Sequence, residues 1–505
     1  MSHLPDLVAA ACTAHADYPR TSPYHPSESY PEYPYRQTEG SAPLGALLGT
    51  EPNEIYAAVR ESLRLAGLDA ANFGTSAWNP LGQFIRPGQF VLLKPNLVKE
   101  WHPRDPDGWI YVITHGSVIR AVADYVWIAL AGRGRVMVAD APQTDSKFSA
   151  MVKLMELDRL ADFYRGQGQN LELVDLRKEE WENVDEVIVE RRKLAGDPCG
   201  YQAYDLADRS EFFQHAGVGR YYGADYDDDE LNRHHTADKH EYLISGSAVA
   251  CDVYINLPKL KTHKKAGITV NLKNLVGVNG DKNWLPHHTV GTPADGGDQF
   301  PNRSWKTWLE HTGAQTLRKT ALALPGVGTW LLKRARRAGK KAFGDGNQTI
   351  RSGNWHGNDT TWRMCLDLNK IVLYGRPDGT FRPAELPAAK PYLCFVDGVL
   401  GGEGNGPMDP DPLASRCILF GSNPGVVDAA SAVILGYDVD KIPIVRQAFH
   451  ARGFPISTGN WREKRLASNR PEWNGTLGEL TGSAATLHTR PHFGWVGHIE
   501  AARTK

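Results

Sequence analysis

The sequence predicts an α/β fold, with a largely parallel sheet flanked by helices and interrupted by two long insertions. One observation is a strand–helix–strand unit over Phe90–Val98, Ser117–Ala131 and Arg135–Asp140, the arrangement that joins neighbouring parallel strands. A second is that short apolar runs recur further along the chain and alternate with helical patterns. The third is composition, since 41% of the 505 residues are hydrophobic and 23% charged, as in ordinary globular proteins.

The remaining core elements follow in chain order. Apolar spacing predicts a helix over Ser149–Tyr164 and a strand over Leu171–Leu176. The later predicted strands are Val253–Leu257, Tyr392–Asp397 and Cys417–Phe420, and the later helices are Val426–Leu435 and Ile444–Ala451. The chain then divides into a Pro/Tyr-rich N-terminal arm (1–45), three stretches of core (46–177, 246–283 and 351–450), a charged insertion (178–245), a Gly/Pro-rich and then basic insertion (284–350), and a C-terminal appendage (451–505).

Charge, cysteine spacing and hydropathy argue against several classes of protein. The 57 basic and 58 acidic residues give a net charge of -1, which does not suit a globally basic nucleic-acid-binding protein. None of the six cysteines forms a C-x-x-C pair, so the chain offers no ligand set for an iron–sulfur cluster. We expect a cytoplasmic protein, because neither a secretory signal nor a transmembrane run is visible. The basic segment 316–343 suits either a solvated insertion or peripheral contact with an anionic membrane.

Basic and amide side chains cluster where predicted strands end, which is where open α/β sheets bind ligands. Lysine, histidine and asparagine supply the charge and donors that a phosphate or carboxylate requires. The alternative for the lysines is a protected, exposed sheet edge. The candidate catalytic residues are Lys261 and His263. The candidate substrate-binding residues are Lys94, Asn96, Thr114, Ser117, Lys259, Asn271, Lys273, Asn274 and Asn405.

Some of these candidates have a second interpretation. Thr114 and Ser117 stand before a predicted helix, where hydroxyl groups cap the helix and free N–H groups bind anions. Lys282, His287 and His288 extend the basic cluster beyond Asn274. No aromatic residues interleave the lysines, so we expect an anionic small molecule as partner and no nucleic acid.

A glycine-rich acidic segment follows the strand predicted over Tyr392–Asp397. It carries Asp397 and Glu403, and Asp428 stands at the start of the next helix. Carboxylates on a loop suit a hard cation such as Mg²⁺, and glycines allow close approach to a ligand. The sequence therefore predicts a divalent-metal site, most suited to Mg²⁺, with these three carboxylates as ligands. An acidic residue in a first helical turn also needs no further function.

Four segments in this order together resemble the domain of unknown function family 362: VLLKPNLV (91–98), INLPKLKTH (255–263), VNLKNLVG (270–277) and DGVLGGEGNGP (397–407). Gly353–Asn369 is similar to a subgroup with long insertions. The resemblance implies an α/β core in which these segments converge on one site, with Lys94, Asn96, Lys261, His263, Lys273, Asn274, Asp397, Glu403 and Asn405. Some relatives carry ferredoxin-like cysteine clusters. This chain has none, so the resemblance does not imply an iron–sulfur cofactor here.

Three functions are compatible with these features. The leading hypothesis is a metal-assisted enzyme acting on an anionic, phosphorylated or carboxylated, small molecule. His263 would be its general acid or base, because neighbouring lysines lower the pKa of the imidazole and favour the neutral form. The second is a non-catalytic binding protein for an anionic metabolite or lipid headgroup. The third is a redox protein that depends on a partner's iron–sulfur cluster.

Overall fold

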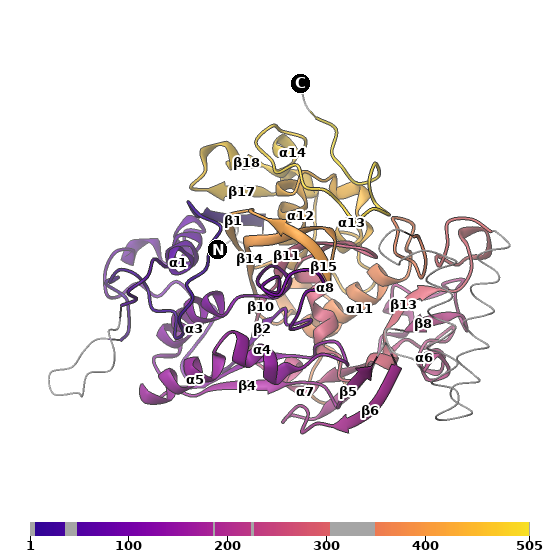
Figure 1. Cartoon of the computed structure of the whole chain (residues 1–505), viewed down its shortest axis with the longest axis horizontal. Coiled ribbons are helices and arrows are strands. Elements are labelled where there is room, and N and C mark those ends of the chain that lie inside the picture. The colour runs from indigo at the N-terminus through magenta and orange to yellow at the C-terminus, as the bar shows by residue number, and fades with distance from the viewer. Residues whose placement is uncertain (1–5, 36–47, 185–186, 224–226, 304–348, 504–505) are drawn as a thin grey trace.

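A twelve-stranded sheet forms the centre of the computed structural model (Figure 1). The structure describes residues 6–35, 48–184, 187–223, 227–303 and 349–503, so the basic segment 316–343 lies outside the described residues. The main strands, in their order across the sheet, are β18 (Gly475–Thr476), β17 (Arg465–Ser468), β1 (Leu7–Cys12), β16 (Cys417–Gly421), β14 (Tyr392–Asn405), β10 (Val253–Leu257), β2 (Phe90–Pro95), β3 (Arg135–Asp140) and β4 (Leu171–Asp175). Three further strands extend the end of β14: β11 (Lys259–His263), β12 (Gly267–Thr269) and β15 (Asp409–Leu413).

The predicted α/β class with a largely parallel sheet is confirmed. Strands β14, β10, β2, β3 and β4 all run in one direction, whereas β16 is antiparallel to both of its neighbours. The chain adds β3 and β4 on one side of β2 and later places β10 on the other side. The strand order therefore reverses between β2 and β10, the point at which open parallel sheets bind ligands beyond their carboxyl ends.

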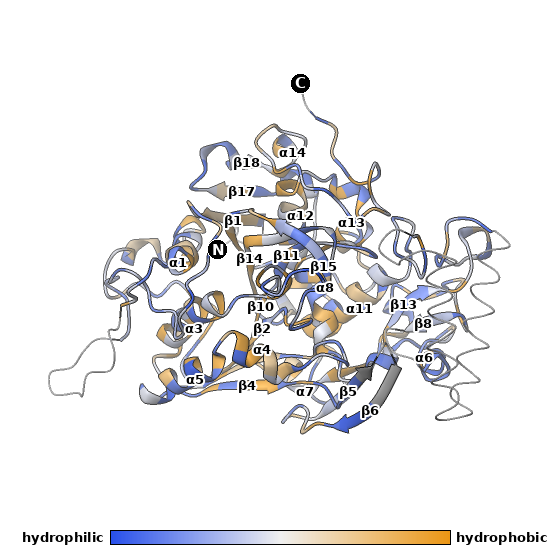
Figure 2. Ribbon diagram, in the orientation of Figure 1, coloured by the Kyte–Doolittle hydropathy of each residue, from blue (hydrophilic) through white to orange (hydrophobic). Residues whose placement is uncertain are grey.

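Helices cover both faces of the sheet, and successive residues of β2 divide between them. Val91 and Leu93 pack with α1 (Glu54–Leu65) and α3 (Gly116–Leu130), while Leu92 faces the opposite cluster. The opposite cluster includes residues of α11 (Thr361–Tyr374), α12 (Pro424–Ile434) and α13 (Pro443–Ala448). The other helices are α2 (Trp109–Val112), α4 (Phe148–Leu154), α5 (Leu157–Gly166), α6 (Asp228–His234), α7 (Gly246–Ala250), α8 (Asn271–Asn274) and α14 (Leu477–Leu480). In Figure 2 hydrophobic colours gather on the central elements, and β15 is hydrophilic.

The two predicted insertions pair with one another. Residues 178–245 contain the hairpin of β5 (Glu179–Val184) and β6 (Val187–Lys193), and β7 (Tyr201–Asp205) pairs with β9 (Glu241–Ser245). A short strand of the first insertion, β8 (Tyr221–Gly223), pairs with β13 (Pro286–Thr289) of the second. This pairing fixes segments of both insertions beside the carboxyl ends of the central strands (Figure 1).

Both ends of the chain enter the sheet, which the sequence pattern did not indicate. The segment predicted as a surface arm begins with β1, an alanine-rich strand whose inner residues are buried between β16 and β17. The predicted C-terminal appendage supplies β17 and β18. Alanine has little intrinsic preference for strands, and the partners of β1 are more than 400 residues away. Local periodicity therefore could not reveal this strand.

Candidate functional site

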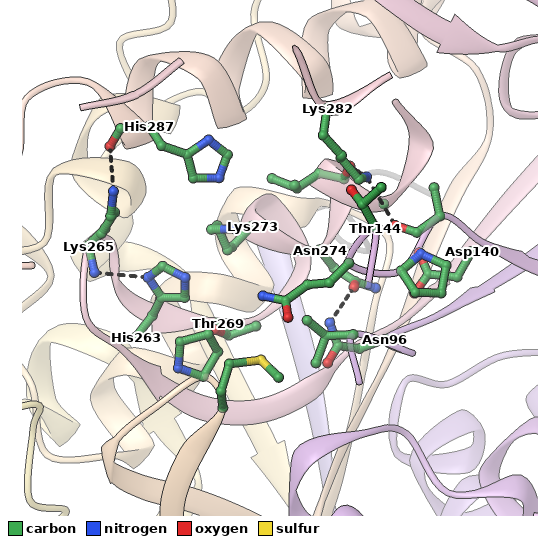
Figure 3. A pocket seen from close by; sticks show the side chains of 18 of the residues that line it. Asn96, Asp140, Thr144, His263, Lys265, Thr269, Lys273, Asn274, Lys282 and His287 are labelled. Carbon is green, nitrogen blue, oxygen red and sulfur yellow. Dashed lines mark hydrogen bonds between the residues drawn. The ribbon is translucent and has the colours of Figure 1, made fainter. Parts of the chain in front are cut away.

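A cavity of about 400 Å³ lies beyond the carboxyl ends of β2, β3 and β10 (Figure 3). Six of its lining residues are lysines and two are aspartates. Trp181 and Gly223 of the first insertion line it, as do His287 of the second insertion and Lys282 just before it. The cavity is therefore built by the strand ends and closed in part by segments outside the core strands.

Six of the residues predicted from sequence line this cavity: Lys94, Asn96, Lys261, His263, Lys273 and Asn274. They come from the end of β2 and the residue after it, from β11 and from α8. The remaining predicted residues lie outside the cavity lining: Thr114, Ser117, Lys259, Asn271, Asn405, Asp397, Glu403 and Asp428. The structure thus brings part of the predicted set together and separates the acidic residues from it.

One wall of the cavity is a closed hydrogen-bond network. Lys94 Nζ lies 2.7 Å from Asp140 Oδ1 and donates to Asn274 Oδ1 at 3.0 Å. The Asn96 amide also donates to Asn274 Oδ1, at 2.9 Å, and its own oxygen accepts from Lys261 Nζ at 3.1 Å. Burial lowers the pKa of Lys94, and the neighbouring Asp140 carboxylate opposes this shift. Because these polar atoms already have partners, the network positions Lys261 and keeps the wall rigid.

Lys261 is fully buried, and no carboxylate among the described residues pairs with it. Its ammonium group donates to Asn96 Oδ1 and to the carbonyl oxygen of Val112. Burial, followed by the positive charges of Lys259 and Lys273, moves the Lys261 pKa well below that of an exposed lysine. A buried lysine of this kind exchanges a proton closer to neutral pH than an exposed one does.

Two polar groups at the centre of the cavity have no protein partner among the described residues. Lys273 Nζ has neither a hydrogen bond nor an ion pair there, and burial lowers its pKa. The Thr269 hydroxyl is also without a partner, although the residue is only 3% exposed. Figure 3 shows Lys273 between His263 and His287. The Lys273 ammonium group is therefore available to a bound molecule, whereas the Thr269 hydroxyl is enclosed by protein.

The backbone fixes the tautomer of His263. Its Nδ1 accepts the N–H groups of Lys265 and Ala266, each at 3.0 Å. A nitrogen that accepts two N–H donors carries no proton, so the neutral ring is protonated at Nε2. Burial, then Lys273 and Lys264, lower the pKa of His263 well below its ordinary value. The neutral ring agrees with the sequence-based expectation. The role of general base does not fit, because the unprotonated nitrogen is already occupied and the free Nε2–H is a donor.

His287 has the opposite tautomer, and sequence reasoning did not select it. Its Nδ1 lies 2.9 Å from the carbonyl oxygen of Leu285, which can only accept, so Nδ1 carries the proton. Burial, then Lys265 and Lys273, lower the pKa of the imidazole well below its ordinary value. The lone pair of a neutral ring is then at Nε2. The only signal in the sequence was that His287 extends the basic cluster.

Comparison with known proteins decides the family. The family model described as domain of unknown function (DUF362) matches residues 91–203 and 196–433. The chain belongs to this family. No curated protein matches the chain. One similar solved structure is a crystal structure of a protein from Thermotoga maritima, determined by the Northeast Structural Genomics Consortium, with 10% identity and a TM-score of 0.25. The match covers 65% of this chain and 49% of that protein, so the chain spans about half of its length.

In this DUF362 protein the predicted metal ligands do not meet. Asp397 lies 2.8 Å from Lys259 Nζ and accepts the Tyr18 hydroxyl. Asp428 accepts the backbone N–H groups of Asn271 and Leu272. Glu403 accepts from the backbone of Arg490. Among the described residues no group of three or more His, Cys, Asp or Glu side chains is placed to hold a metal ion. The three-carboxylate site is thus not assembled, because each carboxylate already has a different set of donors.

The glycine-rich segment is part of a strand and not a loop. β14 continues without interruption to Asn405, and β11 runs alongside it. A Cβ atom at Gly401 would lie 2.5 Å from the carbonyl oxygen of Leu260, and one at Gly406 would overlap the carbonyl oxygen of Thr262. These two glycines are therefore explained by the close approach of β11, which carries Lys261 and His263 to the cavity.

The segment before α3 has a structural role. His115, and not a hydroxyl side chain, caps the helix by accepting the N–H of Ser117 at 3.2 Å. The Thr114 hydroxyl donates to the carbonyl oxygen of Leu257 and accepts the N–H of Asn96. Thr114 therefore ties the end of β2 to the end of β10, which aligns the two strand ends that form the cavity. No helix within the described ranges is long and apolar enough to cross a membrane.

Proposed function

We propose that this DUF362 protein is an enzyme acting on an anionic small molecule, phosphorylated or carboxylated, that binds in the cavity beyond β2, β3 and β10. The supporting observation is an excess of positive charge. The two lining aspartates, Asp140 and Asp145, are paired with Lys94 and Lys99. The lining lysines without a carboxylate partner among the described residues are Lys261, Lys264, Lys265 and Lys273. Lys264 is exposed, whereas the other three are at least partly enclosed. Enclosing ammonium groups without counter-charge is unfavourable, and a bound anion offsets that cost.

Acid–base groups beside the anion support catalysis rather than binding alone. Burial and the neighbouring Lys264 lower the pKa of Lys265 well below that of an exposed lysine. The two cavity histidines are held neutral in opposite tautomers, one donating and one accepting. The pKa of Lys265 is displaced toward neutrality, and a lysine of this kind that faces a cavity is typical of proton-transfer sites.

In this proposal the lysines that line the cavity stabilise the negative charge of the substrate. The divalent metal expected from the sequence has no three-carboxylate ligand set among the described residues. The lipid-headgroup hypothesis drew on the segment 316–343, which lies outside the described residues. A binding protein for an anionic metabolite would use the same cavity, and turnover separates it from an enzyme.

Calorimetric titration of inorganic phosphate, pyrophosphate and citrate into the purified protein tests the anion site. Lys273→Met keeps the length of the side chain and removes the charge that has no protein partner. Losing one charge-assisted hydrogen bond of about 1.5–3 kcal/mol weakens binding roughly 10- to 150-fold. Lys153→Met, at an exposed position on α4, is the matched control and should bind as the wild type does. Equal anion affinity in Lys273→Met and the wild type would show that the cavity is not the anion site.

Incubation with a mixture of phosphorylated and carboxylated metabolites, followed by mass spectrometry, tests for turnover. Chemical change of a metabolite by the wild type, but not by Lys273→Met, supports an enzyme. Retention of a metabolite without chemical change supports a binding protein that uses the same cavity.

A further inference from the structure

The cavity presents a defined set of hydrogen-bond donors. His263 offers Nε2–H, because its Nδ1 is occupied by two backbone donors, and the residue is only 5% exposed. The Lys273 ammonium group lies next to it and has no partner among the described residues (Figure 3). Both groups can only donate to a ligand in these states, so both favour anionic oxygens.

Each side-chain oxygen of Asp140, Asn96 and Asn274 on the network wall already has a protein donor. Asp140 Oδ1 pairs with Lys94, and Oδ2 accepts the N–H of Leu97. The Asn96 oxygen accepts from Lys261, and the Asn274 oxygen accepts two donors. A ligand O–H would therefore have to share a wall oxygen that already has a protein donor.

His287 supplies an acceptor on the opposite side of Lys273. Donation from Nδ1 to the Leu285 carbonyl leaves the lone pair at Nε2, and this nitrogen has no partner among the described residues. The positive charges of Lys265 and Lys273 oppose a second proton on the ring. An anionic oxygen placed against this lone pair would be repelled, whereas an O–H group would form a hydrogen bond.

We propose that the ligand is an oxyanion that carries its own O–H group, with its anionic oxygens facing Lys273 and His263 and its O–H donating to His287 Nε2. This inference rests on the proposed function and specifies the substrate class. Two sources share this chemistry. Hydrogen phosphate carries the O–H on the anionic group itself, and a hydroxy acid carries it on a neighbouring carbon. Sulfate has no O–H at neutral pH and leaves the lone pair opposed to an anionic oxygen.

Two matched pairs of anions test the proposal by calorimetry at pH 7.5: phosphate against sulfate, and malate against succinate. A site with an acceptor for an O–H rejects the analogue that lacks it, so we expect a preference of about tenfold or more in at least one pair. Preference in the first pair identifies a phosphate-type ligand, and preference confined to the second identifies a hydroxy acid. Equal affinity within both pairs overturns this inference while leaving the anion site in place. Binding of none of the four anions overturns the anion site as well.

The His287→Phe variant keeps an aromatic ring and removes the acceptor. It should bind both members of the preferred pair with equal affinity, and His450→Phe, at an exposed position outside the cavity, should keep the preference. Full preference in His287→Phe would refute the role of His287.

Chemical modification of the wild-type histidines tests the same assignment without depending on whether His287→Phe folds. Diethyl pyrocarbonate reacts with an unprotonated imidazole nitrogen, so peptide mass spectrometry should find His287 modified and His263 unmodified. The preferred anion should slow modification of His287. Modification of His263 with His287 left intact would reverse the assigned tautomers and overturn the proposal.

Discussion

Replacing Gly277 with alanine should disturb the ion pair that supports the cavity wall. A Cβ atom at this position would overlap Asp140 Oδ1 and lie 2.6 Å from Lys94 Nζ. These two atoms form the 2.7 Å ion pair, and the residues that carry them are buried, at 2% and 0% exposure. A methyl group therefore fits only if the two charges move apart inside a packed interior.

The expected loss of stability depends on the hydrogen bonds that Lys94 and Asp140 retain in the variant. Breaking a buried pair by removing one partner costs about 3–5 kcal/mol, and overpacking a core costs about 1–3 kcal/mol. Here both partners remain, and each retains other hydrogen bonds: Lys94 to Asn274, and Asp140 from the Leu97 N–H. We therefore expect a loss of about 3 kcal/mol in the free energy of unfolding, near the overlap of the two ranges.

Urea unfolding followed by tryptophan fluorescence measures this loss. Gly166→Ala is the matched control, because Gly166 ends α5 and nothing lies within 4 Å of its Cβ position. Alanine in a helix is favoured over glycine, so the control should be unchanged or more stable by about 0.5–1 kcal/mol. If Gly277→Ala unfolded at the same urea concentration as Gly166→Ala, the account of this wall would be wrong.

Three further predictions concern single side chains. Burial and a neighbouring lysine lower the pKa of Lys265, so its side chain is charged at low pH and loses the charge at a lower pH than an exposed lysine does. Anion affinity measured by calorimetry should therefore fall as the pH rises through the pKa of Lys265. Lys265→Arg should extend anion binding to higher pH, because arginine stays charged. Thr269→Val should leave stability to urea unchanged or raise it by about 1 kcal/mol, since the buried hydroxyl has no partner; a clear loss would contradict this. Tyr18→Phe should cost about 1–3 kcal/mol in unfolding, because it removes one of the two acceptors of the buried Lys259 ammonium and a donor to Asp397. Tyr30→Phe, whose hydroxyl donates to the exposed Glu28, should cost little.

The fold class and the location of a polar cluster could both be predicted from the amino-acid sequence. The β2 and β10 segments are nearly continuous apolar runs, each followed at once by polar residues, which is typical of buried parallel strands. Since the carboxyl ends of parallel strands meet at one edge of the sheet, the sequence alone places Lys94 and Lys261 at one site. This argument needs only periodicity and the direction of the strands.

Which of these side chains remain available to a ligand depends on contacts between residues far apart in the chain. In the sequence, Asp397 and Asn274 both look available to bind a ligand. In the structure, the side-chain oxygens of both already accept hydrogen bonds or pair with lysines from distant parts of the chain. His263 and His287 are chemically identical residues, and the backbone groups that each meets make one a donor and the other an acceptor. A hydrogen-bonding group has a limited number of donor and acceptor positions, and folding fills them with partners from far along the chain. Local sequence patterns do not identify those partners, so the free donors and acceptors of the cavity could be assigned only from the folded structure.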